Sequence, residues 1–223
     1  DVINENIKRF VSHRPEGNYY VRGTYTKFNK DFSQDIAHWL EQGYQIVSME
    51  PVVGKEEPWA LHEEDLEDIK KEYKKLADLY WQKKQEGKPF EFFHFNVNLN
   101  HGPCLQKRLT GCGAGYEYMA VTPEGDLYPC HQFVGRDEFK IGNIKEGVQK
   151  PEVIEQFRQA HIYNKEACKH CWARFFCSGG CHANAESFHG TLLQPYELGC
   201  ALEKSRLEYA IWLAVKSQLA ENT

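Results

Sequence analysis

The chain has 223 residues, of which 41% are apolar, and a formal net charge of −5. That length is enough for one large domain or two small ones, each with a real core. The acidic balance and the lack of a basic stripe argue against nucleic acid as a partner, and no apolar run approaches the roughly 18 residues of a membrane span. We therefore expect neither a nucleic-acid nor a membrane partner, and a cytoplasmic location.

Strand and helix patterns alternate through the first hundred residues. Residues 18–26 are rich in Tyr, Val and Thr and predict a strand, and the apolar run at residues 45–53 predicts a second, buried strand. Between them we expect a helix over residues 32–42, with Asp31 or Ser33 as its cap.

A long amphipathic helix and a third strand are expected next. The apolar face of this helix is marked by residues three or four apart: Leu66, Ile69, Tyr73, Leu76 and Tyr80. The third strand is expected over residues 90–99. The β-α-β-α-β order predicts a parallel sheet with right-handed connections. Three strands cannot close a barrel, but they fit the last part of a (β/α) barrel.

The composition changes near residue 100, where Gly, Pro, Cys and aromatic residues replace the regular alternation. Residues 118–130 predict a β-hairpin, residues 151–160 a short helix and residues 202–219 a final helix. The predicted fold class is α/β, with the partial barrel as one domain (1–100) and a loop-rich, cysteine-rich second domain (101–223).

All eight cysteines lie in this second domain. An even count is compatible with four disulfides, but a chain of this size does not need them for stability, and no export signal is visible. Four thiols fall within the short run C-x2-C-x5-C-x3-C that begins at Cys168. Thiolates are soft ligands that select zinc, copper(I) or iron–sulfur clusters. The spacing therefore predicts a soft-metal site without choosing the metal.

The wider pattern resembles the SPASM domain, the C-terminal auxiliary-cluster domain of radical S-adenosylmethionine (SAM) peptide-modifying enzymes. Cys112, Gly125 and Cys130 precede the cysteine run, Cys200 follows it, and GDLYPC, IGNI and CSGGC are typical surroundings. The stretch HGPCLQKRLTGCGAG is most similar to the maturases of six-cysteine (SCIFF) peptides. Residues 18–99 resemble the last strands and helices of the radical SAM barrel.

The resemblance implies two auxiliary [4Fe–4S] clusters with interleaved ligands. The ligands of the first cluster would be Cys112, Cys130 and Cys181. Those of the second would be Cys168, Cys171, Cys177 and Cys200. Cys104 lies where some relatives supply a fourth ligand to the first cluster. It either binds that iron or leaves it open for a substrate thiolate.

Two charged residues in the predicted strands are candidates for binding SAM. Arg22 and Glu50 lie toward the C-terminal ends of their strands, where barrel active sites gather. A guanidinium can also form a forked pair with a carboxylate. The alternative for Arg22 is a surface or barrel-lining salt bridge. No catalytic residue is assigned.

The resemblance further implies a function for the full-length protein. A reduced cluster cleaves SAM to a 5′-deoxyadenosyl radical, which takes a hydrogen from a cysteine-rich precursor peptide, and a thioether crosslink forms. A reductant such as ferredoxin or flavodoxin would supply the electron. The CxxxCxxC motif that holds this third [4Fe–4S] cluster is absent from the sequence. We therefore expect a C-terminal portion that needs the missing N-terminal part and does not cleave SAM alone.

Three other interpretations remain open. The chain could be a stand-alone iron–sulfur electron-transfer module, although such a carrier has no need of a half-barrel. It could belong to another SPASM radical SAM enzyme, such as a sulfatase-maturing type. It could also be a zinc-stabilised interaction domain, which would be colourless rather than brown.

Overall fold

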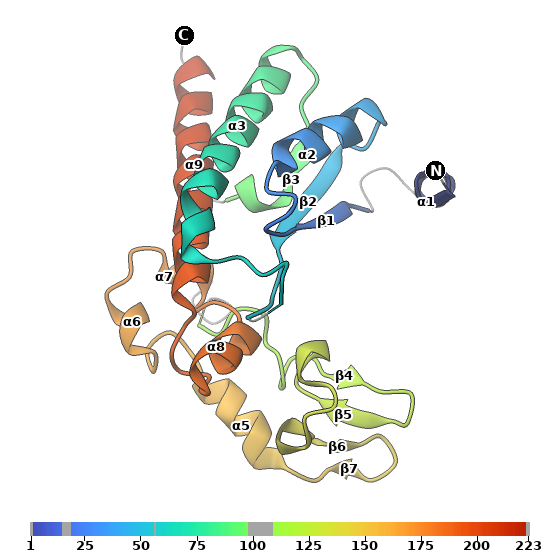
Figure 1. Ribbon diagram of the computed structural model, residues 1–223, viewed down its shortest axis with the longest axis vertical. Helices are drawn as coiled ribbons and strands as arrows, with labels where there is room; N and C mark the ends of the chain where they lie inside the picture. The colour runs from blue at the N-terminus through green and yellow to red at the C-terminus, as the bar shows by residue number, and fades with distance from the viewer. Residues whose placement is uncertain (1, 15–18, 56, 98–108, 222–223) are drawn as a thin grey trace. The chain divides into compact units, whose positions relative to one another are not determined.

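The computed structural model describes residues 2–14, 19–55, 57–97 and 109–221 (Figure 1). The chain divides into two compact units. Unit 1 comprises Asp1–Leu99 and Ser205–Thr223, and unit 2 comprises Asn100–Lys204. Residues 205–223 therefore group with unit 1, although their predicted place was in the second domain. The functional division into two domains stays a prediction.

Unit 1 contains a parallel sheet of three strands in the order β1-β2-β3. The strands are β1 (Val21–Tyr25), β2 (Ile46–Pro51) and β3 (Glu91–Phe92). Val21 pairs with Val47, and Ile46 pairs with Glu91. The sheet is parallel as predicted, because each strand is followed by a segment long enough to cross back over it.

The third strand is shorter than the ten residues predicted for it. It gives way to the 3-10 helix η2 (Phe93–Phe95), in which Phe95 turns back to pack on Phe92, with their ring centroids 4.8 Å apart. Phe95 also meets Tyr80 edge to face at 5.7 Å. The aromatic residues that suggested a long strand thus stabilise a turn instead.

Besides η2, five helices lie wholly or partly in the described part of unit 1, one of them a second short 3-10 helix. They are α1 (Val2–Ser12), α2 (Phe32–Glu41), η1 (Glu63–Asp65), α3 (Leu66–Gln85) and α9 (Glu197–Glu221). The sequence did not predict α1. Among the described residues, no helix is both long and apolar enough to cross a membrane.

The last helix is longer than predicted, and its second half belongs to unit 1. The ammonium of Lys216 lies 4.6 Å from the ring centroid of Trp81 on α3. Farther along, Lys84 and Glu221 form an ion pair at 3.9 Å. These contacts explain why the residues after Lys204 group with unit 1 (Figure 1).

The start of α2 is held by a carboxylate from α3. Asp31 precedes the helix but makes no side-chain capping bond, so the predicted cap is not formed. Instead, the backbone N–H of Ser33 donates to Glu72 Oε1 at 3.1 Å, and the Ser33 hydroxyl donates to the same oxygen. A buried anion at the helix N-terminus satisfies otherwise unpaired backbone donors and interacts favourably with the helix dipole.

Unit 2 contains an antiparallel sheet and short helices. Its strands are β4 (Ala120–Val121), β5 (Asp126–Tyr128), β6 (Gly142–Asn143) and β7 (Gly147–Val148), in that order. Its helices are η3 (His131–Phe133), η4 (Asp137–Phe139), α5 (Pro151–Gln159), α6 (Glu166–Lys169), α7 (Arg174–Cys177) and α8 (His182–His189). The predicted hairpin is β4–β5, closed by a bond from Gly125 N–H to Thr122 O at 2.9 Å.

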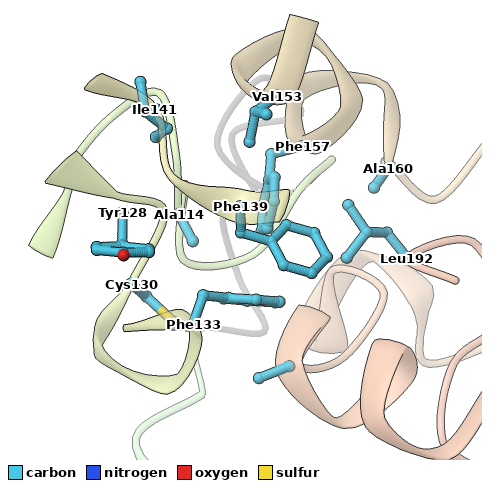
Figure 2. Packing of buried hydrophobic residues seen from close by; sticks show 11 residues of the cluster. Ala114, Tyr128, Cys130, Phe133, Phe139, Ile141, Val153, Phe157, Ala160 and Leu192 are labelled. Atoms are coloured by element: carbon cyan, nitrogen blue, oxygen red, sulfur yellow. The ribbon is translucent and has the colours of Figure 1, made fainter. Parts of the chain in front are cut away.

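An aromatic cluster forms the core of unit 2 (Figure 2). Phe133 lies 4.5 Å from Phe139 and 5.2 Å from Phe157, measured between ring centroids. Cys130 belongs to the same buried cluster, and its sulfur lies beside Phe133 in Figure 2. The hydrophobic core of this unit therefore extends to one of the candidate ligands.

Candidate metal centre

Seven of the eight cysteines are described, and all seven are free thiols in the structure. Three of them lie at the ends of short elements, and a fourth lies at the start of the long last helix. Cys130 directly precedes η3, Cys177 ends α7, Cys181 directly precedes α8, and Cys200 lies in the first turn of α9. Cys104 falls outside the described residues.

Three of these thiols lie within electrostatic reach of one tyrosine. The hydroxyl of Tyr118 donates to Cys112 Sγ at 3.9 Å. Burial raises the pKa of Tyr118, and the charges of Cys112, Cys130 and Cys181 raise it further. Cys181 and Cys112 also raise the pKa of Cys130, after the larger effect of burial. We call Cys112, Cys130 and Cys181 the first cysteine group.

The other four described thiols interact with one another. Burial raises the pKa of Cys200, and the charges of Cys168 and Cys171 add to the rise. The pKa of Cys177 is raised by burial and then by Cys200 and Cys168. We call Cys168, Cys171, Cys177 and Cys200 the second cysteine group. These groups follow the ligand sets implied by the sequence resemblance, and the assignment of ligands stays a prediction.

The pKa values of Cys130, Cys168, Cys177 and Cys200 are raised, chiefly by burial. Burial and mutual repulsion both oppose the charged form of a thiol. The protons leave when a metal takes up the negative charge, because the thiolate is the form that binds metal. Among the described residues, no three His, Cys, Asp or Glu side chains converge closely enough to hold a single metal ion.

Backbone N–H groups act on the sulfur of Cys177 and, through Gln132 and Phe133, on that of Cys130. The N–H groups of Gly179 and Gly180 hydrogen-bond to Cys177 and lower its pKa against the effect of burial. Ser178, Gly179 and Gly180 all have positive φ, at 59°, 89° and 74°. Successive N–H groups in such a conformation form an anion-binding concavity of the kind found at iron–sulfur sites. The loop therefore fits a thiolate-bound cluster.

A histidine beside Cys181 lies in the same core. The His182 ring is 2% exposed and meets Phe157 edge to face, with centroids 5.4 Å apart. Burial and the charge of Lys165 lower the pKa of His182 to about 4. The Thr110 backbone opposes this shift, but no well-formed hydrogen bond reaches either ring nitrogen from the described residues. The imidazole is thus neutral near pH 7.

A polar cluster occupies the C-terminal end of the parallel sheet in unit 1. The carboxylate of Glu50 contacts the His94 ring, with Oε1 and Nε2 2.5 Å apart. The Ser48 hydroxyl donates to the same carboxylate at 3.2 Å. The guanidinium of Arg206 on α9 lies 3.7 Å from Glu50 Oε2. The sequence prediction missed His94 and Arg206. The rule that selected Glu50, its place at a strand end, would also have found His94.

The charges of this cluster keep Glu50 ionised. Burial raises its pKa, but the hydrogen bond from His94 and the charges of His94, Arg206 and Arg22 outweigh this effect, so the pKa falls. The pKa of His94 is also lowered, chiefly by burial. Arg22, paired with Ser48 in the sheet, is therefore close enough to act on Glu50.

Residues 112–172 match the family model of SPASM, described as an iron–sulfur cluster-binding domain. Part of the second unit is therefore similar to this domain. A curated relative, the mycofactocin maturase MftC of Mycolicibacterium smegmatis (strain ATCC 700084 / mc(2)155), is 32% identical over 130 residues. That match covers 52% of this chain and 32% of the relative.

Solved structures of a protein named anSMEcpe share the fold. The native protein with bound AdoMet has a TM-score of 0.69 at 18% identity, over 99% of this chain and 61% of that one. The protein with bound AdoMet and Kp18Cys peptide has a TM-score of 0.64, and the match covers 99% of this chain and 62% of that one. The chain spans less than two thirds of the length of these proteins. The predicted resemblance to SPASM-domain radical SAM maturases and the α/β fold class are confirmed.

Proposed function

We propose that unit 2 holds two auxiliary [4Fe–4S] clusters, one on each cysteine group. The observation that carries this proposal is the spacing of the seven described cysteines, four of which lie within residues 112–172 that match an iron–sulfur cluster-binding domain. Zinc sites bring four ligands to one ion, at about 2.3 Å for sulfur. In a four-iron cluster each thiolate binds a different iron, so the sulfurs surround a larger body.

The residues of this chain would hold and tune such clusters. Each thiolate supplies one iron bond, and the backbone donors of Gly179 and Gly180 stabilise the charge on Cys177. The first group has three described members, so its fourth iron would be bound by Cys104 or left open for a substrate sulfur. A cluster of this kind supplies soft iron sites and one-electron chemistry.

We also propose that the chain is the C-terminal part of a radical SAM maturase that installs thioether crosslinks in a cysteine-rich precursor peptide. The similarity to a mycofactocin maturase supports the maturase class, and the fold shared with a protein that binds AdoMet and a peptide supports both ligands. Within this chain, Arg22 and Glu50 are the proposed SAM-binding residues. Glu50 lies near the C-terminal end of β2, where barrel active sites gather, and Arg22, although it is the second residue of β1, is close enough to act on Glu50.

Metal analysis after anaerobic reconstitution tests the cluster proposal. We expect roughly eight irons and eight sulfides per chain, because two four-iron clusters are bound. The solution should be brown, and Mössbauer spectra should show iron in tetrahedral sulfur coordination. A colourless protein with bound zinc and no iron would contradict the proposal and favour a structural zinc domain.

A further inference from the structure

Lys165 is a lysine whose side chain is entirely buried in unit 2. Its relative exposure is 0%, and it directly precedes α6, three residues before Cys168. Lysines are almost never fully buried unless they are paired with an anion. Within the described ranges, no carboxylate forms an ion pair with Lys165. Its burial therefore needs another explanation.

The ammonium group of Lys165 lies against the loop between Cys177 and Cys181. Lys165 Nζ donates to the carbonyl oxygen of Gly179 at 2.8 Å. A methyl group added at Gly179 would lie 3.3 Å from Lys165 Cδ and 3.4 Å from Nζ, so the lysine fills the space beneath the loop. The two cysteines at the ends of this loop belong to different groups. A single lysine thus fixes the segment that joins the two proposed ligand sets.

The same ammonium lies within electrostatic reach of both cysteine groups. Burial lowers its pKa, while the charges of Cys168, Cys177 and Cys200 in the second group and Cys181 in the first raise it. One hydrogen bond to a carbonyl does not compensate a buried cation for its lost hydration. Thiolate-bound clusters, whose net charge is one of the factors that set their potential, would supply the missing counter-charge.

We propose that Lys165 is a positioning residue shared by the two auxiliary clusters, which raises the reduction potentials of both and holds the loop that connects their ligands. This inference rests on the proposed function. Reduction adds one electron to a cluster, so the reduced form carries more negative charge than the oxidised form. A fixed cation nearby stabilises the reduced form more, and the interaction is strengthened because Lys165 itself is shielded from water.

The test compares midpoint potentials in the reconstituted chain carrying Lys165→Met or Lys169→Met. Met keeps the long unbranched shape without the charge. Lys169 is the matched control, because it lies on α6, is 43% exposed and pairs with Glu166 at the surface. Potentials are measured by dithionite titration followed by EPR, with iron content determined in parallel.

For Lys165→Met we expect both potentials to fall. At a fixed applied potential the reduced-to-oxidised ratio should drop at least tenfold, which is about 59 mV for a one-electron couple. Lys169→Met should leave both potentials unchanged, since exposed charges are screened by solvent and salt. Unchanged potentials in Lys165→Met with full iron content would overturn the proposal.

A second pair of variants keeps the test decisive if Lys165→Met fails to bind iron. Lys165→Gln and Lys165→Arg both retain a donor for Gly179 O, but only Arg retains the charge. A lower potential in the Gln variant than in the Arg variant supports the charge role, and equal potentials overturn it. If the unmodified chain binds no iron–sulfur cluster at all, the proposed function fails before this inference is reached.

Discussion

The backbone around Cys177 is arranged to stabilise a negative charge on its sulfur. A protonated thiol does not carry that charge. Cys177 receives two backbone hydrogen bonds from Gly179 and Gly180, although burial raises its pKa and favours the neutral form. Ser178 adopts φ 59°, the only positive value at a non-glycine residue in the described part of the chain. Such backbone conformations carry an energetic cost and concentrate at functional sites.

Paired substitutions should separate the two cysteine groups. We expect Cys171→Ala with Cys177→Ala to remove about half of the bound iron, because two of the four proposed ligands of one cluster are lost. Cys112→Ala with Cys130→Ala should remove the other half. The melting temperature should fall in both, since metal binding is coupled to folding where loops have little core of their own.

Iron determination and EPR of each double variant measure this directly. The spectra of the two variants should be complementary, with the signal lost in one retained in the other. If either pair abolished all iron, the thiols would form a single shared site. If neither changed the iron content, the ligand assignment would be wrong.

His94 should make the stability of unit 1 depend on pH. Its pKa in the folded state lies below the ordinary value of 6.5, mainly because the ring is buried. Below about pH 6.5 the unfolded state therefore binds more protons than the folded state, and stability falls as the pH drops from there through the folded-state pKa. Each unit of pKa difference corresponds to about 1.4 kcal/mol.

Urea unfolding of the unmodified chain and of His94→Gln between about pH 7 and pH 5 tests this effect. The variant removes the titrating ring but keeps a donor for Glu50, so its free energy of unfolding should change less across this range. His182 titrates in both proteins and cancels in the comparison. Identical pH profiles would show that the His94 pKa is not lowered by folding.

Helices and strands could be predicted from the sequence where buried residues recur at regular intervals. The α3 prediction succeeded because Ile69, Tyr73 and Leu76 recur on one face and are all buried. The β6–β7 pair has two residues in each strand, too few for an alternation to appear. The third strand was overextended because Phe93 and Phe95 have a high strand propensity but pack in a turn.

The residues of the candidate sites could be predicted where they are close together in the sequence, and not where the fold brings distant residues together. The spacing of the cysteines is local, so their place in a metal-binding loop could be predicted. The contact between Arg206 and Glu50 joins residues 156 positions apart (206 − 50), and no short pattern predicts it. Lys165 was missed because a lysine in a polar loop is expected at the surface, and only the packing against Gly179 reveals it.

The whole molecule combines two chemistries that the sequence places in separate units. Unit 1 carries a polar cluster at the end of a parallel sheet, and unit 2 carries two groups of thiols. The last helix contains Cys200 of the second cysteine group and also Arg206, which contacts Glu50. The helix therefore contributes one residue to each site, Cys200 in unit 2 and Arg206 in unit 1.

The final prediction concerns what this chain does without further residues. It contains no CxxxCxxC motif, which in radical SAM enzymes binds the cluster that cleaves SAM. With SAM and a strong reductant, the reconstituted chain should therefore make no 5′-deoxyadenosine, although its proposed auxiliary clusters are reduced. A longer protein that includes both this chain and the motif should make it.

Given a cysteine-rich precursor peptide, that protein should form a carbon–sulfur bond, with one hydrogen lost from the acceptor carbon and one from the thiol. Mass spectrometry detects both products, and Arg22→Met in the longer protein should weaken SAM binding while iron content stays unchanged. Catalytic formation of 5′-deoxyadenosine by the 223-residue chain alone would mean that one of the described cysteine groups cleaves SAM, and the auxiliary role proposed for it would be wrong.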